Sequence, residues 1–138
     1  MDRFLGRYST YIYAILRIVS GFLFMWHGTQ KLFGYPPSGS PSSGEGISPL
    51  MAVGGTIEFV GGIMIMIGLF TTFAAFLSSG MMAVAYFMAH FSTQAFLPVV
   101  NKGELAVVYC FLFLYIASRG SGVWSVDSLF RSSGSNGG

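Results

Sequence analysis

The sequence predicts an all-α membrane protein, a four-helix transmembrane bundle with both termini in the cytoplasm. Of its 138 residues, 53% are hydrophobic and only 9% are charged. Soluble domains carry roughly a quarter charged residues, so this chain has too few to cover a water-facing surface. The apolar runs are long and continuous, whereas a membrane β-barrel would show alternating strands of about ten residues. The composition and these runs together favour membrane-spanning helices.

The first helix is expected over residues 10–33, after a short basic N-terminal segment at 1–9 that we expect to be cytoplasmic. One face of this helix has residues at a spacing of three, then four, and carries every polar or very small residue of the run 17–31 except Thr29 and Gln30: Arg17, Ser20, Gly21, Phe24, His27, Gly28 and Lys31. The other faces are mostly apolar, as expected for a helix with lipid on most sides. The run is too long for a signal peptide and lacks an Ala-x-Ala-like site, so we expect a retained span.

The apolar segment 50–91 is expected to form two helices. Its only charge is Glu58, and as one helix it would be roughly twice as long as a bilayer core of about 30 Å. We expect the hinge at 68–72, which gives helices at 50–69 and 73–91. Small residues four apart predict close helix packing, with Glu58 between the glycines in one stripe. The two stripes are Gly54, Glu58 and Gly62, and Ala75, Ser79 and Ala83.

The fourth helix is expected over residues 102–118, so that the transmembrane domain covers 10–127. Residues 34–49 contain four of the five prolines and are expected to form an exposed loop, and 128–138 a flexible Ser/Gly tail. The cations near the ends of the spans set the orientation. Those on the side of the termini are Arg3, Arg7, Arg119 and Arg131, against Lys31 and Lys102 on the other side. Both termini are therefore expected in the cytoplasm.

This up-and-down topology places polar residues from all four helices in the outer half of the membrane. Ionisable groups are costly there and mark a candidate functional site. The candidate ligand-binding residues are His27, Lys31, Glu58, Tyr86, His90, Asn101 and Glu104. Arg17, on the same face as His27, is expected nearer the inner half, with no carboxylate at its depth.

Two interpretations of this cluster remain open. In the structural one, Glu58 and Glu104 neutralise nearby cations and fix the registry of the helices. In the functional one, the cluster lines a cavity for a small polar-headed lipophile such as a quinone. His27 or His90 would donate to a carbonyl oxygen, and Glu58 would act as proton donor or acceptor. The aromatic walls would be Phe24, Trp26, Phe59, Tyr86 and Phe87.

Other chemistry finds little support in the sequence. Haem ligation by His27 and His90 is geometrically allowed but has no second supporting feature. The single cysteine, Cys110, excludes an internal disulfide and a CxxC thiol-exchange site. We expect no metal site, no intrinsic cofactor and, because the net charge of +2 is spread along the chain, no binding of nucleic acid.

Four segments in order over residues 16–127 carry a family resemblance. They are LRIVSGFLFMWHGTQKLFG, GGTIEFVGGIMIMIGLFT, MAVAYFMAH and LPVVNKGELAVVYCFLFLYIASRGSGVWSVD, and together they resemble the DoxX family. The resemblance implies a small four-span protein of the bacterial cytoplasmic membrane. Some members are associated with a thiosulfate:quinone oxidoreductase or with membrane-attached redox and thiol-stress assemblies. The family's recurrent positions fall here on His27, Lys31, Glu58, His90, Asn101, Glu104, Arg119 and Trp124.

The leading functional hypothesis is a membrane subunit of a quinone-linked redox complex, with a bound quinone or lipid in the outer-half cluster. A partner subunit would supply the electron carrier, because the chain has no flavin, haem or iron–sulfur signature. The alternative is a purely structural accessory subunit at the periphery of a larger respiratory or photosynthetic complex. A small-molecule transporter is disfavoured, since no inverted repeat or broken helix is evident.

Overall fold

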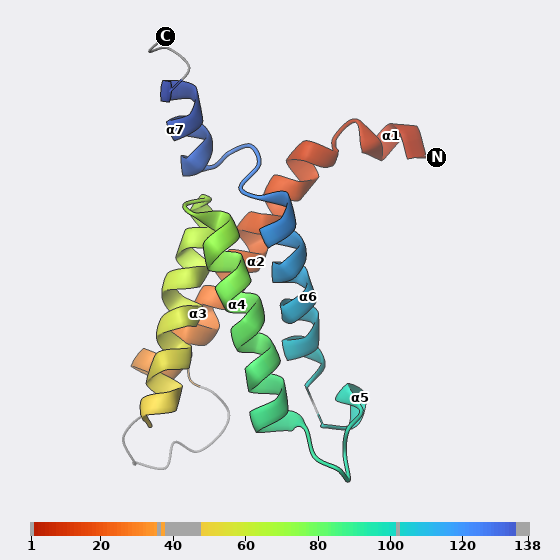
Figure 1. Ribbon diagram of the computed structural model, residues 1–138, viewed down its shortest axis with the longest axis vertical. Helices are drawn as coiled ribbons and strands as arrows, with labels where there is room; N and C mark the ends of the chain where they lie inside the picture. Colours follow the sequence, from red (N-terminus) through yellow and green to blue (C-terminus); the bar gives the residue numbers. More distant parts are fainter. Residues whose placement is uncertain (1, 36, 38–47, 102, 135–138) are drawn as a thin grey trace.

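The computed structural model describes residues 2–35, 37, 48–101 and 103–134 (Figure 1). Throughout these residues the regular structure is helical and contains no strand. The elements are α1 (Asp2–Gly6), α2 (Ser9–Phe33), α3 (Pro49–Ile67), α4 (Thr71–Ala85), the π-helical turn η1 (Tyr86–His90), α5 (Pro98–Asn101), α6 (Glu104–Arg119) and α7 (Val126–Gly134). The prediction of an all-helical membrane protein is confirmed: within the described ranges, Ser9–Phe33, Pro49–Ile67 and Thr71–His90 are long and apolar enough to cross a membrane.

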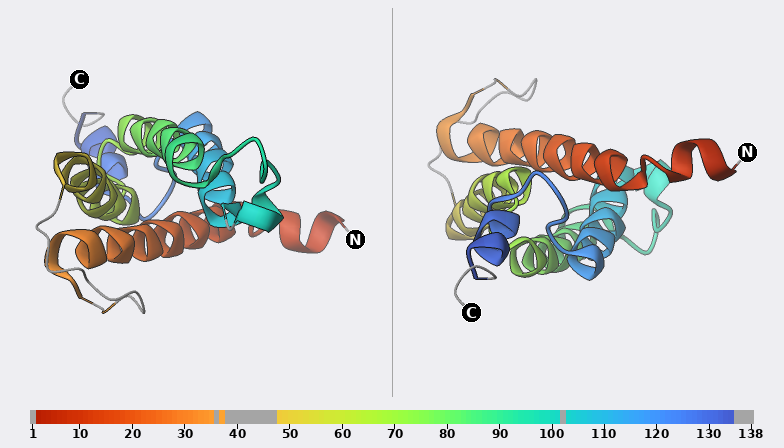
Figure 2. Two further views of the ribbon diagram at one scale, coloured as in Figure 1. Left: turned by 90° about the horizontal axis from the view of Figure 1, so that it is seen from below. Right: turned by 90° about the horizontal axis from the view of Figure 1, so that it is seen from above.

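The long helices pack in sequence: α2 against α3, α3 against α4, and α4 against α6. In Figure 2, α2 runs along one side of the molecule and α3, α4 and α6 lie on the other. One end of the molecule, the terminal end, carries α1, α7 and the α3–α4 turn (Figure 1). The opposite end, the loop end, carries η1, α5 and the start of α3. α6 has 16 residues and is shorter than α2 and α3.

Glycines set the close approach of α2 to α3. A Cβ atom added at Gly21 would lie 2.5 Å from the Met66 nitrogen, and one at Gly62 would lie 2.6 Å from the Met25 nitrogen. Gly54, however, has its nearest neighbouring atom 4.0 Å away. Gly62 of the predicted stripe therefore lies at this interface and Gly54 does not, because α2 packs on the face that begins at Gly55, one residue further along α3.

The turn between α3 and α4 falls inside the predicted hinge. Gly68 ends α3 in the left-handed conformation with φ of 76°, and its N–H bonds to the Met64 carbonyl oxygen. Phe70 is also left-handed, with φ of 46°, and its own side chain does not cap α4. The Asp127 carboxylate takes that place, accepting hydrogen bonds from the N–H groups of Phe70 at 3.0 Å and Thr71 at 3.3 Å. A segment far away in the sequence thus caps α4.

Helical structure continues into the segment from residue 128 that the sequence analysis expected to be a flexible tail. Residues 126–134 form α7, with Asp127 in its first turn. Ser125 starts the helix, because its hydroxyl oxygen accepts from the Ser128 N–H at 3.2 Å. The sequence analysis missed Ser125 as a helix-capping residue because the segment is rich in Ser and Gly. Residues 135–138 lie outside the described part of the chain, as does most of the predicted loop at 34–49.

Candidate functional site

A pocket of about 360 Å³ lies between α2, α3, α4 with η1, and α6. Its lining combines apolar side chains with ionisable ones from three of these helices. The lining residues are Phe24, His27, Lys31, Glu58, Met82, Ala85, Ala89, His90, Leu105, Ala106 and Tyr109. The structure therefore brings together His27, Lys31, Glu58 and His90, which the sequence analysis had placed at a common depth on three helices.

The centre of this pocket is an ion pair between α2 and α3. Lys31 Nζ donates to Glu58 Oε1 over 2.7 Å. The Glu58 side chain is only 3% exposed, whereas that of Lys31 is 37% exposed. The second carboxylate oxygen, Oε2, is buried and has no hydrogen-bond partner among the described residues. An unsatisfied buried acceptor costs about 1–3 kcal/mol, and more when it is charged.

The two partners meet because their helices touch at glycines. A Cβ at Gly28 would lie 2.7 Å from the Gly55 carbonyl oxygen and would also collide with the Phe59 backbone. Lys31 follows Gly28 by three residues and Glu58 follows Gly55 by three, so both side chains project from this contact. His27 lies four residues before Lys31 on the same face of α2.

Aromatic rings from α2 and α6 form part of the pocket wall. The Tyr109 ring stacks on Phe113, with centroids 5.3 Å apart and planes at 8°, and meets His27 edge-on at 6.0 Å. Phe24 packs against both Tyr109 and Phe113. Tyr109 was not among the predicted site residues. The signal for it was present, since Ala106, Tyr109, Phe113 and Ile116 recur at helical spacing and form the buried face of α6.

Tyr86 contacts His90, one of the residues that line the pocket. It is buried, its hydroxyl donates to the Phe96 carbonyl oxygen at 2.7 Å, and its ring stacks on His90 with centroids 6.5 Å apart. It does not line the pocket. Because π-turns occur frequently at functional sites, the π-helical geometry of η1 is itself a pointer to this position. Tyr86 thus orients His90 and anchors the connection after η1.

Two other predicted members, Glu104 and Asn101, are not found among the lining residues of the described part of the chain. Glu104 is exposed in the first turn of α6 and is not a lining residue. Asn101 ends α5, and its side chain, like all of Lys102, lies outside what the structure describes. The expected aromatic wall is corrected too: Phe87 is 64% exposed, because the π-turn directs Tyr86 inward, and Phe59 packs on Phe33 with ring centroids 5.8 Å apart.

Arg17 forms a separate polar centre toward the terminal end. Its guanidinium is fully buried and donates to the carbonyl oxygens of Ile65 at 2.8 Å, Met66 at 3.0 Å, Val123 at 3.2 Å and Trp124 at 2.7 Å. The first two are free carbonyls at the end of α3, where the helix dipole favours a cation. Arg17 thereby ties α2, α3 and the segment before α7 together, and among the described residues no carboxylate forms an ion pair with it.

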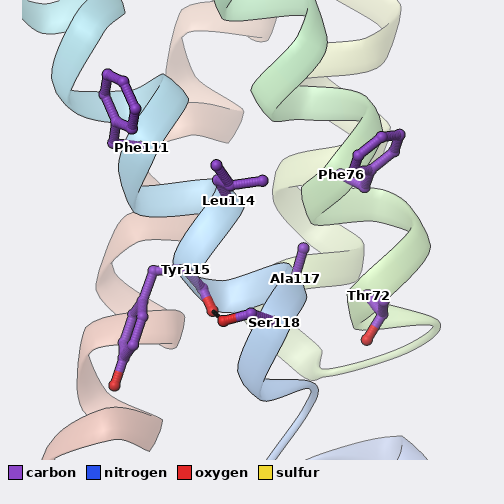
Figure 3. A pocket seen from close by; sticks show the side chains of 7 residues that line it. All are labelled: Thr72, Phe76, Phe111, Leu114, Tyr115, Ala117 and Ser118. Carbon is purple, nitrogen blue, oxygen red and sulfur yellow. Dashed lines mark hydrogen bonds between the residues drawn. The ribbon is translucent and has the colours of Figure 1, made fainter.

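A second hollow, of about 480 Å³, lies between α4 and α6 (Figure 3). Its lining is mainly apolar, and Phe111 and Phe76 stand on either side of Leu114. The hydroxyl of Ser118 at its rim is already bonded to the Tyr115 carbonyl oxygen. This hollow offers contact for a lipid chain and no reactive group. Within the described ranges, no three His, Cys, Asp or Glu side chains are close enough to share a metal ion.

Comparisons with known proteins agree with the resemblance seen in the sequence. The family model DoxX matches residues 12–91. A protein of Haemophilus influenzae whose function is uncharacterized is 42% identical over 128 residues, which cover 91% of this chain and 96% of its own length. No solved structure matches the chain.

Proposed function

Because the chain belongs to the DoxX family, we propose that it is a membrane subunit of a quinone-linked redox complex. The pocket around Glu58 would bind the polar head of a lipophile. The observation that carries this proposal is the buried Glu58 carboxylate, which lines an apolar pocket and keeps one oxygen without a partner among the described residues. Such a group is retained against its cost where a ligand completes it.

The pocket suits a quinone head in size and in chemistry. A volume of about 360 Å³ is at the small end of ligand sites, which span roughly 300–1,000 Å³ and combine apolar walls with a few convergent polar groups. His27 and His90 can each donate a hydrogen bond, and Glu58 with Lys31 can exchange a proton. Electrons would come from a partner subunit that holds the electron carrier. Membrane lipids would surround the rest of the chain.

The same proposal includes four spans with both termini in the cytoplasm of a bacterial inner membrane, α6 being the fourth. At 1.5 Å per residue α6 is about 24 Å long, close to a bilayer core of roughly 30 Å. Labelling tests the orientation: Gly6→Cys, in a Cys110→Ala background, should react with an impermeant maleimide in inside-out vesicles and not in intact spheroplasts. Gly6 suits the probe because nothing lies within 4 Å of its Cβ position.

A structural accessory subunit of a larger complex is the second candidate. The 2.7 Å pair of Lys31 and Glu58 favours it, since two opposite charges that neutralise each other require no ligand. Exposed apolar side chains on every long helix would also suit packing against other membrane subunits. In this case the polar cluster would only fix the registry of α2 and α3.

Binding in nanodiscs separates the two candidates. The purified chain is titrated with decylubiquinone and with decylubiquinol, whose fully substituted rings do not add thiols. We expect saturable binding of at least one form, and its loss in Ala85→Leu, which fills the pocket. The matched control is Val84→Leu on the neighbouring, 54% exposed position. Absence of binding by either form, with a stoichiometric large partner in mild detergent extracts, would establish the accessory role instead.

A further inference from the structure

We propose that the pocket selects a headgroup that carries a hydroxyl, so that it binds the hydroquinone form of its ligand in preference to the quinone. This inference rests on the proposed function and adds to it the redox form and the chemical group that is recognised. It follows from how the four walls of the pocket distribute hydrogen-bond donors and acceptors around the buried carboxylate.

The carboxylate can only be completed by a donor. Lys31 Nζ lies 2.7 Å from Oε1, the distance of a charge-assisted hydrogen bond to an ionised carboxylate. An ionised carboxylate has no proton to give, so Oε2 can accept and cannot donate. In the described part of the chain no group donates to it, and the atom is buried, so a ligand hydroxyl reaches it once the Glu58 side chain turns toward the pocket that it lines. A quinone carbonyl is also an acceptor only and would repel this oxygen. A hydroquinone hydroxyl would satisfy it.

The other polar groups of the pocket do not oppose this selection. Neutral His27 and His90 each have a donor and an acceptor nitrogen, and the Tyr109 hydroxyl does both, so these groups can meet a carbonyl or a hydroxyl equally well. Lys31 has further N–H groups that a carbonyl could use. Its side chain is 37% exposed, however, and those groups can bond to water in the absence of a ligand. Before a ligand binds, the Glu58 carboxylate therefore lacks a hydrogen-bond partner more than Lys31 does.

A tailed ligand would also find apolar surface next to the pocket. A groove of about 380 Å³ runs beside it on α2 and α6, lined by Leu23, Trp26, His27, Gln30, Leu105 and Tyr109. His27, Leu105 and Tyr109 line both spaces, so these side chains form the boundary between them. Whereas α2 and α3 touch at glycines, α2 meets α6 through aromatic rings. A membrane-borne hydroquinone would then bind with its head in the pocket and its alkyl tail in the groove.

The first test compares three ligands on the wild-type chain. Decylubiquinol, decylubiquinone and the dimethyl ether of decylubiquinol are titrated calorimetrically into the protein in nanodiscs, without oxygen. We expect the quinol to bind about tenfold or more tightly than the quinone, the ratio that follows from satisfying one buried acceptor. The ether, which keeps the ring and loses both donors, should bind no better than the quinone. This comparison needs no variant and therefore does not depend on one folding.

The second test changes the acceptor. In Glu58→Gln the amide oxygen can remain with Lys31, and the amide N–H group then takes the place of Oε2. We expect the preference to fall and to reverse in favour of the quinone. Asp127→Asn, the same change at the terminal end, should keep the wild-type ratio. Equal binding of quinol, quinone and ether by the wild type would overturn this inference and leave the proposed function standing. Absence of binding by all three would overturn both.

Discussion

Replacing the two members of the buried ion pair separately should have unequal effects. Lys31→Met leaves the 3% exposed Glu58 carboxylate without its cation. Removing one partner of a buried pair costs roughly 3–5 kcal/mol, and because Lys31 is partly exposed to water we expect a value near the lower end, about 3 kcal/mol. Glu58→Gln removes the buried charge itself and leaves Lys31 free to bond to water, so we expect a loss of about 1 kcal/mol. The double change to Met at both positions should lie near the wild type.

The measurement is the free energy of unfolding in mixed micelles, titrated with sodium dodecyl sulfate and followed by circular dichroism. The double-mutant cycle gives the coupling between the two positions. The critical result is that Lys31→Met loses more free energy of unfolding than Glu58→Gln, because this difference follows from the burial of Glu58 and the partial exposure of Lys31. If Lys31→Met were no more damaging than Glu58→Gln, the carboxylate would have to be hydrated, and the reasoning about Oε2 would be refuted.

Three further predictions concern the scaffold and use the same unfolding measurement. Gly28→Ala should destabilise the protein by about 1–3 kcal/mol, because the added Cβ collides with the backbone of α3. The control Gly80→Ala has no neighbouring atom within 4 Å of the added Cβ and should stabilise α4 by about 0.5–1 kcal/mol. A neutral Gly28→Ala would contradict the close helix contact. Asp127→Ala should cost about 1 kcal/mol through loss of the cap on α4, with Asp127→Asn costing less; equal losses would indicate another role. Arg17→Met should cost at least about 3 kcal/mol, since it leaves several buried carbonyls unpaired, and Arg17→Lys should recover only part of this because it lacks the guanidinium fork.

The segment that follows α6, residues 120–127, has a structural role that its contacts explain. Gly120, Gly122 and Trp124 all have positive φ, so the chain bends sharply after the end of α6. The bend brings the Trp124 carbonyl to Arg17 and the Asp127 carboxylate to the start of α4. Arg119 places its guanidinium over the Tyr13 ring at 5.2 Å. This segment therefore closes the terminal end of the fold and lies apart from the pocket.

The sequence by itself determined the class of this protein and the location of its polar groups. Low charge and long apolar runs predicted membrane-spanning helices, and the 3.6-residue period placed His27 and Lys31 on one buried face. The motifs identified the DoxX family, which the comparison confirmed. These features are local, because helix formation and the direction of a side chain around its own helix depend on neighbours in the sequence.

Only the tertiary structure decided which of these groups meet. The contact of Gly28 with Gly55 sets the rotation and distance of α2 and α3, and hence the pairing of Lys31 with Glu58. The packing of α6 against α4 and against Phe24 brings Tyr109 into the pocket. A periodic pattern gives each helix its own buried face but not its rotation relative to the next one, and a helix-to-helix contact of a few ångströms depends on that rotation.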